Sequence, residues 1–125
     1  MPRTKVLLID DEAEFVTALA ERLQLRNYDA TAVFCADDAF SAFLKNPPDV
    51  VLLDLKMPGM DGTEVLKTLK LYDPSVEVII LTGLGAEQSG NEGIRRGAFD
   101  YVVKPVDIDD LTVKIDQAKK KKDKE

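Results

Sequence analysis

Short apolar runs alternate with longer segments of helical periodicity along this chain, and this alternation limits the fold more than any other feature of the sequence. Each run is typical of a buried strand, and each is followed by a segment whose apolar residues recur on one helical face. Alternating strands and helices build βαβ units around a parallel sheet. The sequence therefore predicts an α/β fold: a doubly wound parallel sheet of five strands, with five helices on its two faces. The expected strands are residues 6–9, 31–34, 50–53, 76–81 and 101–103.

The chain has 125 residues, 45% of them apolar, which is the size and composition of one compact domain. We expect a domain over residues 1–118 and a lysine-rich tail over residues 119–125, as a solvated, frayed helix end. Because the net charge is −6 and the five lysines and two acids of the tail contribute +3, the domain carries −9. An acidic domain repels nucleic acid, so we expect no direct binding of nucleic acid by this chain. No apolar run approaches the ~18 residues of a membrane span, so we expect no membrane partner either.

Two residue types that often build active sites are absent or scarce. The chain has no histidine, which excludes histidine triads, histidine metal sites and phosphohistidine from this chain alone. Its single cysteine, Cys35, cannot form an internal disulfide, and we expect it to be a small buried residue.

Polar side chains with catalytic or ligating potential follow four of the expected strands. Asp10 and Asp11 follow the first, Asp54 the third, Thr82 the fourth and Lys104 the fifth. In open parallel sheets, ligands bind beyond the carboxyl ends of the strands, where the strand order reverses. If the strand order is 2-1-3-4-5, the first and third strands are neighbours, and three carboxylates converge at this edge of the sheet.

Three carboxylates within a few ångströms repel one another, and a hard divalent cation relieves that repulsion. Mg²⁺ prefers oxygen ligands and commonly bridges carboxylates to a phosphate. A carboxylate can also attack phosphorus to give an aspartyl phosphate, with Lys104 and Thr82 supplying a cation and a hydroxyl donor for the phosphoryl oxygens. Ordinary structural roles stay open: Asp11 could cap the next helix, Thr82 could simply favour a strand, and Lys104 could be an exposed lysine.

Four motifs in this order and spacing resemble the receiver domain of two-component response regulators, the CheY-like superfamily. The resemblance implies a flavodoxin-like fold with the strand order 2-1-3-4-5. The resemblance extends from about Lys5 to about Lys119, nearly the whole chain. The motifs are Leu8-Ile9-Asp10-Asp11-Glu12, the block from Leu52 to Gly62 that contains Asp54 and Met57-Pro58-Gly59, the step Leu81-Thr82-Gly83, and Asp100-Tyr101-Val102-Val103-Lys104-Pro105.

The resemblance implies that Asp54 is phosphorylated by a partner histidine kinase or histidine phosphotransfer protein, and that Mg²⁺ is the cofactor. By the same likeness, Asp11, Asp54 and the backbone carbonyl of Lys56 coordinate the ion, and Asp10 acts through a water molecule. If the phosphorylated histidine belongs to the partner protein, this chain needs no histidine of its own.

The resemblance further implies that Thr82 and Lys104 contact the phosphoryl oxygens, and that Tyr101 turns inward as Thr82 moves toward the phosphate. It implies a cis peptide bond between Lys104 and Pro105. The expected protein is a bacterial, cytoplasmic signalling switch and not an enzyme with a separate substrate. A downstream protein would bind the face formed by the fourth helix, fifth strand and fifth helix, and a phosphorylation-dependent homodimer stays open.

Three other functions compete with this interpretation. A magnesium-dependent phosphatase that forms an aspartyl phosphate is the main alternative, although its class typically has a second acid where this chain has Lys56. A nucleotide or flavin binder would need a glycine-rich turn after the first strand, where this chain has acids. A receiver-like domain that only binds proteins would not need Asp54, Thr82 and Lys104 together.

Overall fold

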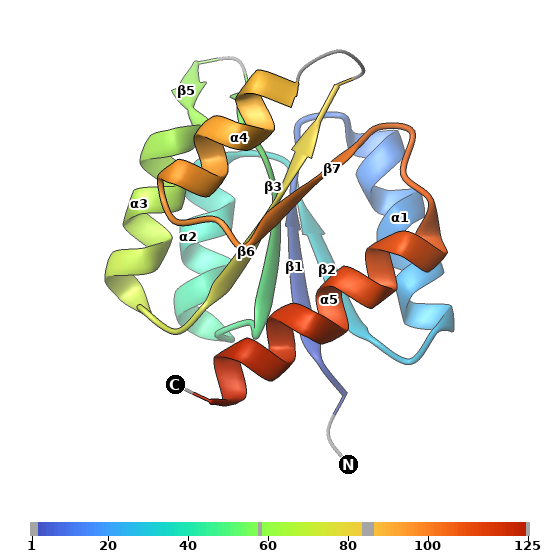
Figure 1. The fold of residues 1–125 in the computed structure, drawn as a ribbon. Coiled ribbons are helices and arrows are strands. Elements are labelled where there is room, and N and C mark those ends of the chain that lie inside the picture. The colour runs from blue at the N-terminus through green and yellow to red at the C-terminus, as the bar shows by residue number, and fades with distance from the viewer. Residues whose placement is uncertain (1–2, 58, 84–86, 125) are drawn as a thin grey trace.

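The structure is a computed structural model that describes residues 3–57, 59–83 and 87–124. In these residues, a parallel sheet of five strands has the order β2-β1-β3-β6-β7 (Figure 1). The order predicted from the sequence is confirmed, because two short additional strands, β4 and β5, only shift the numbering. The sheet strands are β1 (Lys5–Ile9), β2 (Asp29–Val33), β3 (Val50–Asp54), β6 (Glu77–Thr82) and β7 (Asp100–Val103).

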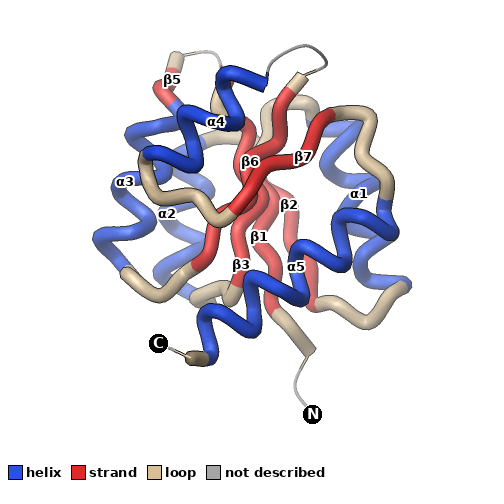
Figure 2. Tube along the Cα trace, in the orientation of Figure 1, coloured by secondary structure: helices blue, strands red, loops and turns tan. Residues whose placement is uncertain are grey.

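Helices cover both faces of the sheet. Figures 1 and 2 show α1 and α5 on one face and α2, α3 and α4 on the other. Within the described residues, no helix has both the length and the apolar content to cross a lipid bilayer. The helices are α1 (Ala13–Leu25), α2 (Ala36–Lys45), α3 (Gly62–Tyr72), α4 (Glu87–Arg95) and α5 (Ile108–Asp123).

The sheet separates two hydrophobic cores, because successive side chains of a strand point to opposite faces. Leu8 of β1 and Leu52 of β3 pack in the core beneath α1 and α5. Their neighbours Ile9 and Leu53 pack in the core beneath α2 and α3. All four side chains are fully buried, so β1 and β3 lie between two packed layers and their carboxyl ends are held firmly in place.

A short hairpin between β3 and α3 was not predicted from the sequence. Its strands, β4 (Lys56–Met57) and β5 (Met60–Asp61), pair antiparallel. Asp61 then caps α3 by accepting a hydrogen bond of 2.9 Å from the backbone nitrogen of Thr63. Strands of two residues are too short to show a period of two, so the apolar pattern of the sequence does not reveal them.

The prediction that Cys35 is buried is wrong. Its side chain is exposed. The strand β2 ends at Val33, and Cys35 occupies the N-cap position of α2 with extended backbone angles. The chain has therefore left the sheet before Cys35, and the next residue, Ala36, is the one that enters the core.

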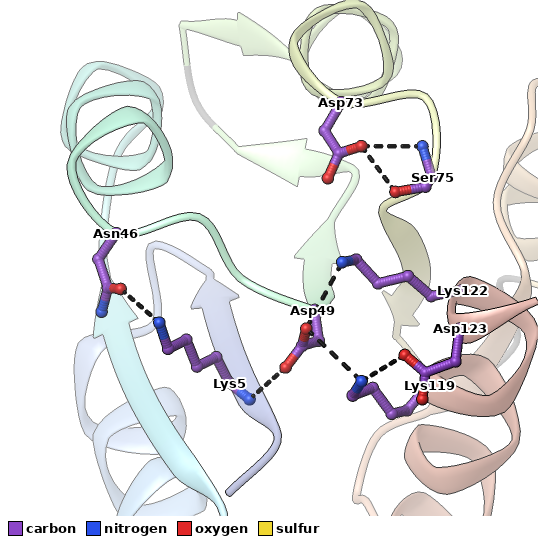
Figure 3. A network of polar contacts seen from close by, with 8 residues as sticks. All are labelled: Lys5, Asn46, Asp49, Asp73, Ser75, Lys119, Lys122 and Asp123. Carbon is purple, nitrogen blue, oxygen red and sulfur yellow. Dashed lines mark hydrogen bonds and ion pairs between the residues drawn. The ribbon is translucent and has the colours of Figure 1, made fainter. Parts of the chain in front are cut away.

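The last helix continues past the predicted domain boundary at residue 118. Its lysine-rich end is helical as far as Asp123, and the ammonium group of Lys121 lies 3.3 Å from Glu77 Oε2 at the start of β6. The ammonium groups of Lys119 and Lys122 lie 3.9 and 3.5 Å from Asp49 Oδ1, just before β3 (Figure 3). The division into a domain and a tail at residue 118 stays a prediction, but these contacts join the two parts.

Tyr28, just before β2, connects the sheet to α5 and gives a testable pH dependence. Its hydroxyl donates a hydrogen bond of 2.7 Å to Asp116. Burial and this hydrogen bond raise the pKa of Tyr28 above its ordinary value. Above pH ~10 the unfolded chain loses this proton and the folded chain keeps it, so the free energy of unfolding should fall as pH rises.

We expect urea unfolding to show this fall between about pH 9 and pH 11, and to show a smaller fall in Tyr28→Phe, which has no proton to lose. All other ionisable groups are the same in both proteins, so the difference between the two slopes isolates Tyr28. Equal slopes in the two proteins would contradict the prediction.

Candidate functional site

Two strands bring the predicted acids together at the carboxyl end of the sheet. Asp54 is the last residue of β3, and Asp10 directly follows β1. The two strands pair in parallel, with Ile9 opposite Leu53, so Asp10 and Asp54 leave the sheet side by side. Both side chains are buried, which places two carboxylates where burial disfavours their charge.

Lys104, which follows β7, reaches across to these acids. Its ammonium nitrogen lies 2.7 Å from Asp10 Oδ2 and 3.7 Å from Asp54 Oδ2. The side chain is 14% exposed. The ring of Phe15 on α1 lies beneath the ammonium group, 4.7 Å away, in a cation–π contact. The peptide bond from Lys104 to Pro105 is cis, as the resemblance implied.

The acid that completes this cluster is Glu12. Among the described residues, carboxylate oxygens of Asp10, Glu12 and Asp54 all lie within 4.8 Å of one another. Asp11 does not belong to this group; it is exposed and lines a surface pocket beside Cys35. Asp10 to Glu12 form the turn between β1 and α1, where the chain leaves the sheet, and the Asp10 carboxylate accepts a hydrogen bond of 2.9 Å from the backbone nitrogen of Glu12. The prediction that Asp11 binds the ion directly is not tested by this arrangement.

The electrostatics of the site favour an additional cation. Burial raises the pKa of Asp10, and the nearby charge of Asp54 raises it further, although Lys104 and the backbone nitrogen of Glu12 act against this shift. Burial would lower the pKa of Lys104, but its close contacts with Asp10 and Glu12 raise it above its ordinary value. Lys104 is therefore held as a cation, yet one cation does not balance three carboxylates.

The donor set suits a hard divalent cation. Asp10 Oδ2 is buried, and its partner among the described residues is the Lys104 ammonium group, 2.7 Å away in an ion pair outside hydrogen-bond geometry. Three carboxylates that share one ammonium group leave negative charge that a metal ion would neutralise. Carboxylate oxygens are the ligands that Mg²⁺ prefers. The residues present therefore fit a magnesium site.

Three further predicted residues line the same edge of the sheet. Thr82 ends β6 and is buried, and its hydroxyl donates a hydrogen bond of 3.3 Å to the carbonyl of Val102. Lys56 donates its backbone nitrogen to Asp54 Oδ1 at 2.9 Å. Tyr101 is half-buried on β7, and its carbonyl accepts a hydrogen bond from Lys114. The switching and metal-binding roles predicted for these residues are not tested by these contacts.

Comparison with known protein families matches residues 6–116 to the response regulator receiver domain. The chain belongs to this family. Sporulation initiation phosphotransferase F of Bacillus subtilis is 36% identical to this receiver domain over 111 residues, which cover 89% of this chain and 90% of that protein. The regulatory protein AtoC of Escherichia coli is 33% identical over 114 residues, which cover 91% of this chain.

The receiver domain spans only part of several longer relatives. It matches 25% of the length of AtoC and 51% of a probable transcriptional regulator, ycf27, of Porphyridium aerugineum. Among solved structures, the receiver domain of NtrX from Brucella abortus aligns with a TM-score of 0.87 at 30% identity. That alignment covers 92% of this chain and 98% of the NtrX domain.

Two residues of the site were missed in the sequence. Glu12 lies two positions after Asp10, in the same acidic motif after the first strand, and that position was the available signal. Phe15 was not predicted as a site residue. Its contact with Lys104 joins residues 89 positions apart, and nothing in local periodicity predicts such a contact.

Proposed function

We propose that this receiver domain is a phosphorylation-dependent switch that accepts a phosphoryl group on Asp54. The observation that carries the proposal is the position of Asp54: it ends a central strand, next to a second buried carboxylate and 3.7 Å from the ammonium group of Lys104. The domain assists its own phosphorylation and dephosphorylation and turns over no other substrate. The membership of the receiver family supports this function.

In the proposed reaction, a carboxylate oxygen of Asp54 attacks the phosphorus of a phosphohistidine on a partner kinase or phosphotransfer protein. A bond forms from Asp54 to phosphorus as the phosphorus–nitrogen bond breaks, and the imidazole leaves with the electron pair. Lys104 moves toward the phosphoryl oxygens, and Thr82 exchanges its bond to Val102 for one to the phosphate. Tyr101 then turns inward.

Mg²⁺ would be held by Asp11, Asp54 and the backbone carbonyl of Lys56, and by Asp10 through a water molecule. The carboxylate of Glu12 lies close to those of Asp10 and Asp54. When bound, the ion supplies positive charge for the carboxylates and the incoming phosphoryl group. This chain's own contribution is to fix the acids on rigid strand ends, where a flexible loop would let them move apart.

The output surface is proposed to be the face formed by α4, β7 and α5, which a downstream protein would bind. Exposed apolar side chains on this face, Ile94 on α4 and Val113 on α5, support a protein partner. A phosphorylation-dependent homodimer through the same face stays open. We propose a cytoplasmic location, where a kinase could reach the domain.

The proposal is tested by incubating the protein with Mg²⁺ and a small acyl phosphate and measuring its intact mass. We expect one added phosphoryl group, labile to hydroxylamine, and none in Asp54→Asn. Asp38→Asn is the matched control, because Asp38 is an exposed acid on α2 and its loss should leave phosphorylation unchanged. An unchanged mass in the parent protein would contradict the switch.

The phosphatase alternative is tested with the same protein and an excess of a phosphomonoester. A switch should release no more than traces of inorganic phosphate. Sustained release that disappears in Asp54→Asn would support the phosphatase and contradict the switch.

A further inference from the structure

Lys104 is held by a carboxylate outside the predicted set. Its ammonium nitrogen donates a hydrogen bond of 2.6 Å to Glu12 Oε1. The same nitrogen is 3.7 Å from Asp54. The cation that the proposed function assigns to the phosphoryl group is thus engaged elsewhere before phosphorylation, on the side of the cluster formed by Asp10 and Glu12.

Glu12 differs from Asp10 in its surroundings. The side chain of Asp10 is fully buried on a strand end, whereas that of Glu12 is 60% exposed at the start of α1. Lys104 has a long, flexible side chain, so its ammonium group can follow the nearest anion. A phosphoryl group on Asp54 would bring two negative charges to the other side of this ammonium group.

We infer that Glu12 is a positioning residue that competes with the phosphoryl group for Lys104 and thereby slows phosphorylation of Asp54. This inference rests on the proposed function. Before the reaction, Lys104 must leave Glu12 to reach the phosphoryl oxygens, so the ion pair adds to the barrier. After the reaction, Lys104 already contacts the phosphate, so Glu12 has little effect on hydrolysis.

The test compares Glu12→Gln with the parent protein at saturating Mg²⁺, using a small acyl phosphate as donor. We expect the rate constant for phosphorylation to rise by up to about fivefold, the range that one exposed ion pair provides, with an unchanged rate of dephosphorylation. Glu14→Gln is the matched control, because Glu14 is exposed on the same helix and its loss changes the charge equally. Equal rates in Glu12→Gln and Glu14→Gln would overturn the inference.

Two further measurements separate this role from other effects of Glu12. In a Lys104→Gln background, Glu12→Gln should change no rate, because the competition needs the ammonium group; an increase that persists there would overturn the inference. Calorimetric titration with Mg²⁺ should show only a small loss of affinity in Glu12→Gln, as expected from removing one charge near the site without removing a ligand. A large loss of affinity would identify Glu12 as a metal ligand and overturn the positioning role.

The failure of this inference can be told from failure of the proposed function. If the parent protein takes up no phosphoryl group, the switch itself is wrong. If the parent is phosphorylated and Glu12→Gln behaves like it, only the role of Glu12 is wrong.

Discussion

Replacing Gly62 by alanine is expected to lower the free energy of unfolding by about 3 kcal/mol, at the upper end for an overpacked site. An added Cβ at Gly62 would lie 2.4 Å from Leu55 Cα and 2.6 Å from the Leu55 carbonyl oxygen. Both atoms belong to the backbone, so no side-chain rotation relieves the clash. The hydrogen bond of 3.2 Å from the Gly62 nitrogen to the Leu55 carbonyl holds the two segments together.

The same substitution should impair phosphorylation, because Leu55 directly follows Asp54. A displaced Leu55 backbone moves the acceptor and the nitrogen of Lys56 that donates to it. Gly83→Ala is the control, since an added Cβ there meets nothing within 4 Å. Urea unfolding measures the change in stability, and intact mass measures phosphorylation. If Gly62→Ala and the parent protein had the same urea midpoint of unfolding, the predicted clash between residue 62 and the Leu55 backbone would be wrong.

The architecture and the main acids were predictable because they depend on local patterns. Buried parallel strands appear as apolar runs, and a residue that follows such a run lies at the carboxyl edge of the sheet. The sequence alone therefore placed Asp10, Asp54 and Lys104 at one edge. Their mutual distances also required the strand order, which the resemblance supplied and the structure confirmed.

Other features depend on contacts that no local pattern records. The strands β4 and β5 are too short to show a period, and the exposure of Cys35 depends on where β2 ends. The lysines at the end of α5 form a charge run that, in the sequence alone, looks solvated. Their partners lie more than 40 positions earlier in the chain, at Asp49 and Glu77.

Glu77 is the second position where we expect a large effect. It opens β6 with its side chain 1% exposed, and its oxygens lie 3.6 Å from the ammonium group of Lys70 and 3.3 Å from that of Lys121. Removing the cationic partner of a buried carboxylate lowers the free energy of unfolding of a protein by about 3–5 kcal/mol. We expect Lys70→Met with Lys121→Met to lower the free energy of unfolding by about 3 kcal/mol, the lower end, because Lys121 is half-exposed.

The matched control is Lys67→Met with Lys120→Met, which removes two exposed lysines from the same two helices. This control changes the net charge by the same amount and should lower the free energy of unfolding only slightly. Adding Glu77→Gln to the Lys70 and Lys121 variant should restore most of the lost stability, because the burial cost belongs to the charge and the amide carries none. If Glu77→Gln restored nothing, the loss would come from the alkyl chains of the lysines, and the ion pairs would not stabilise this end of α5.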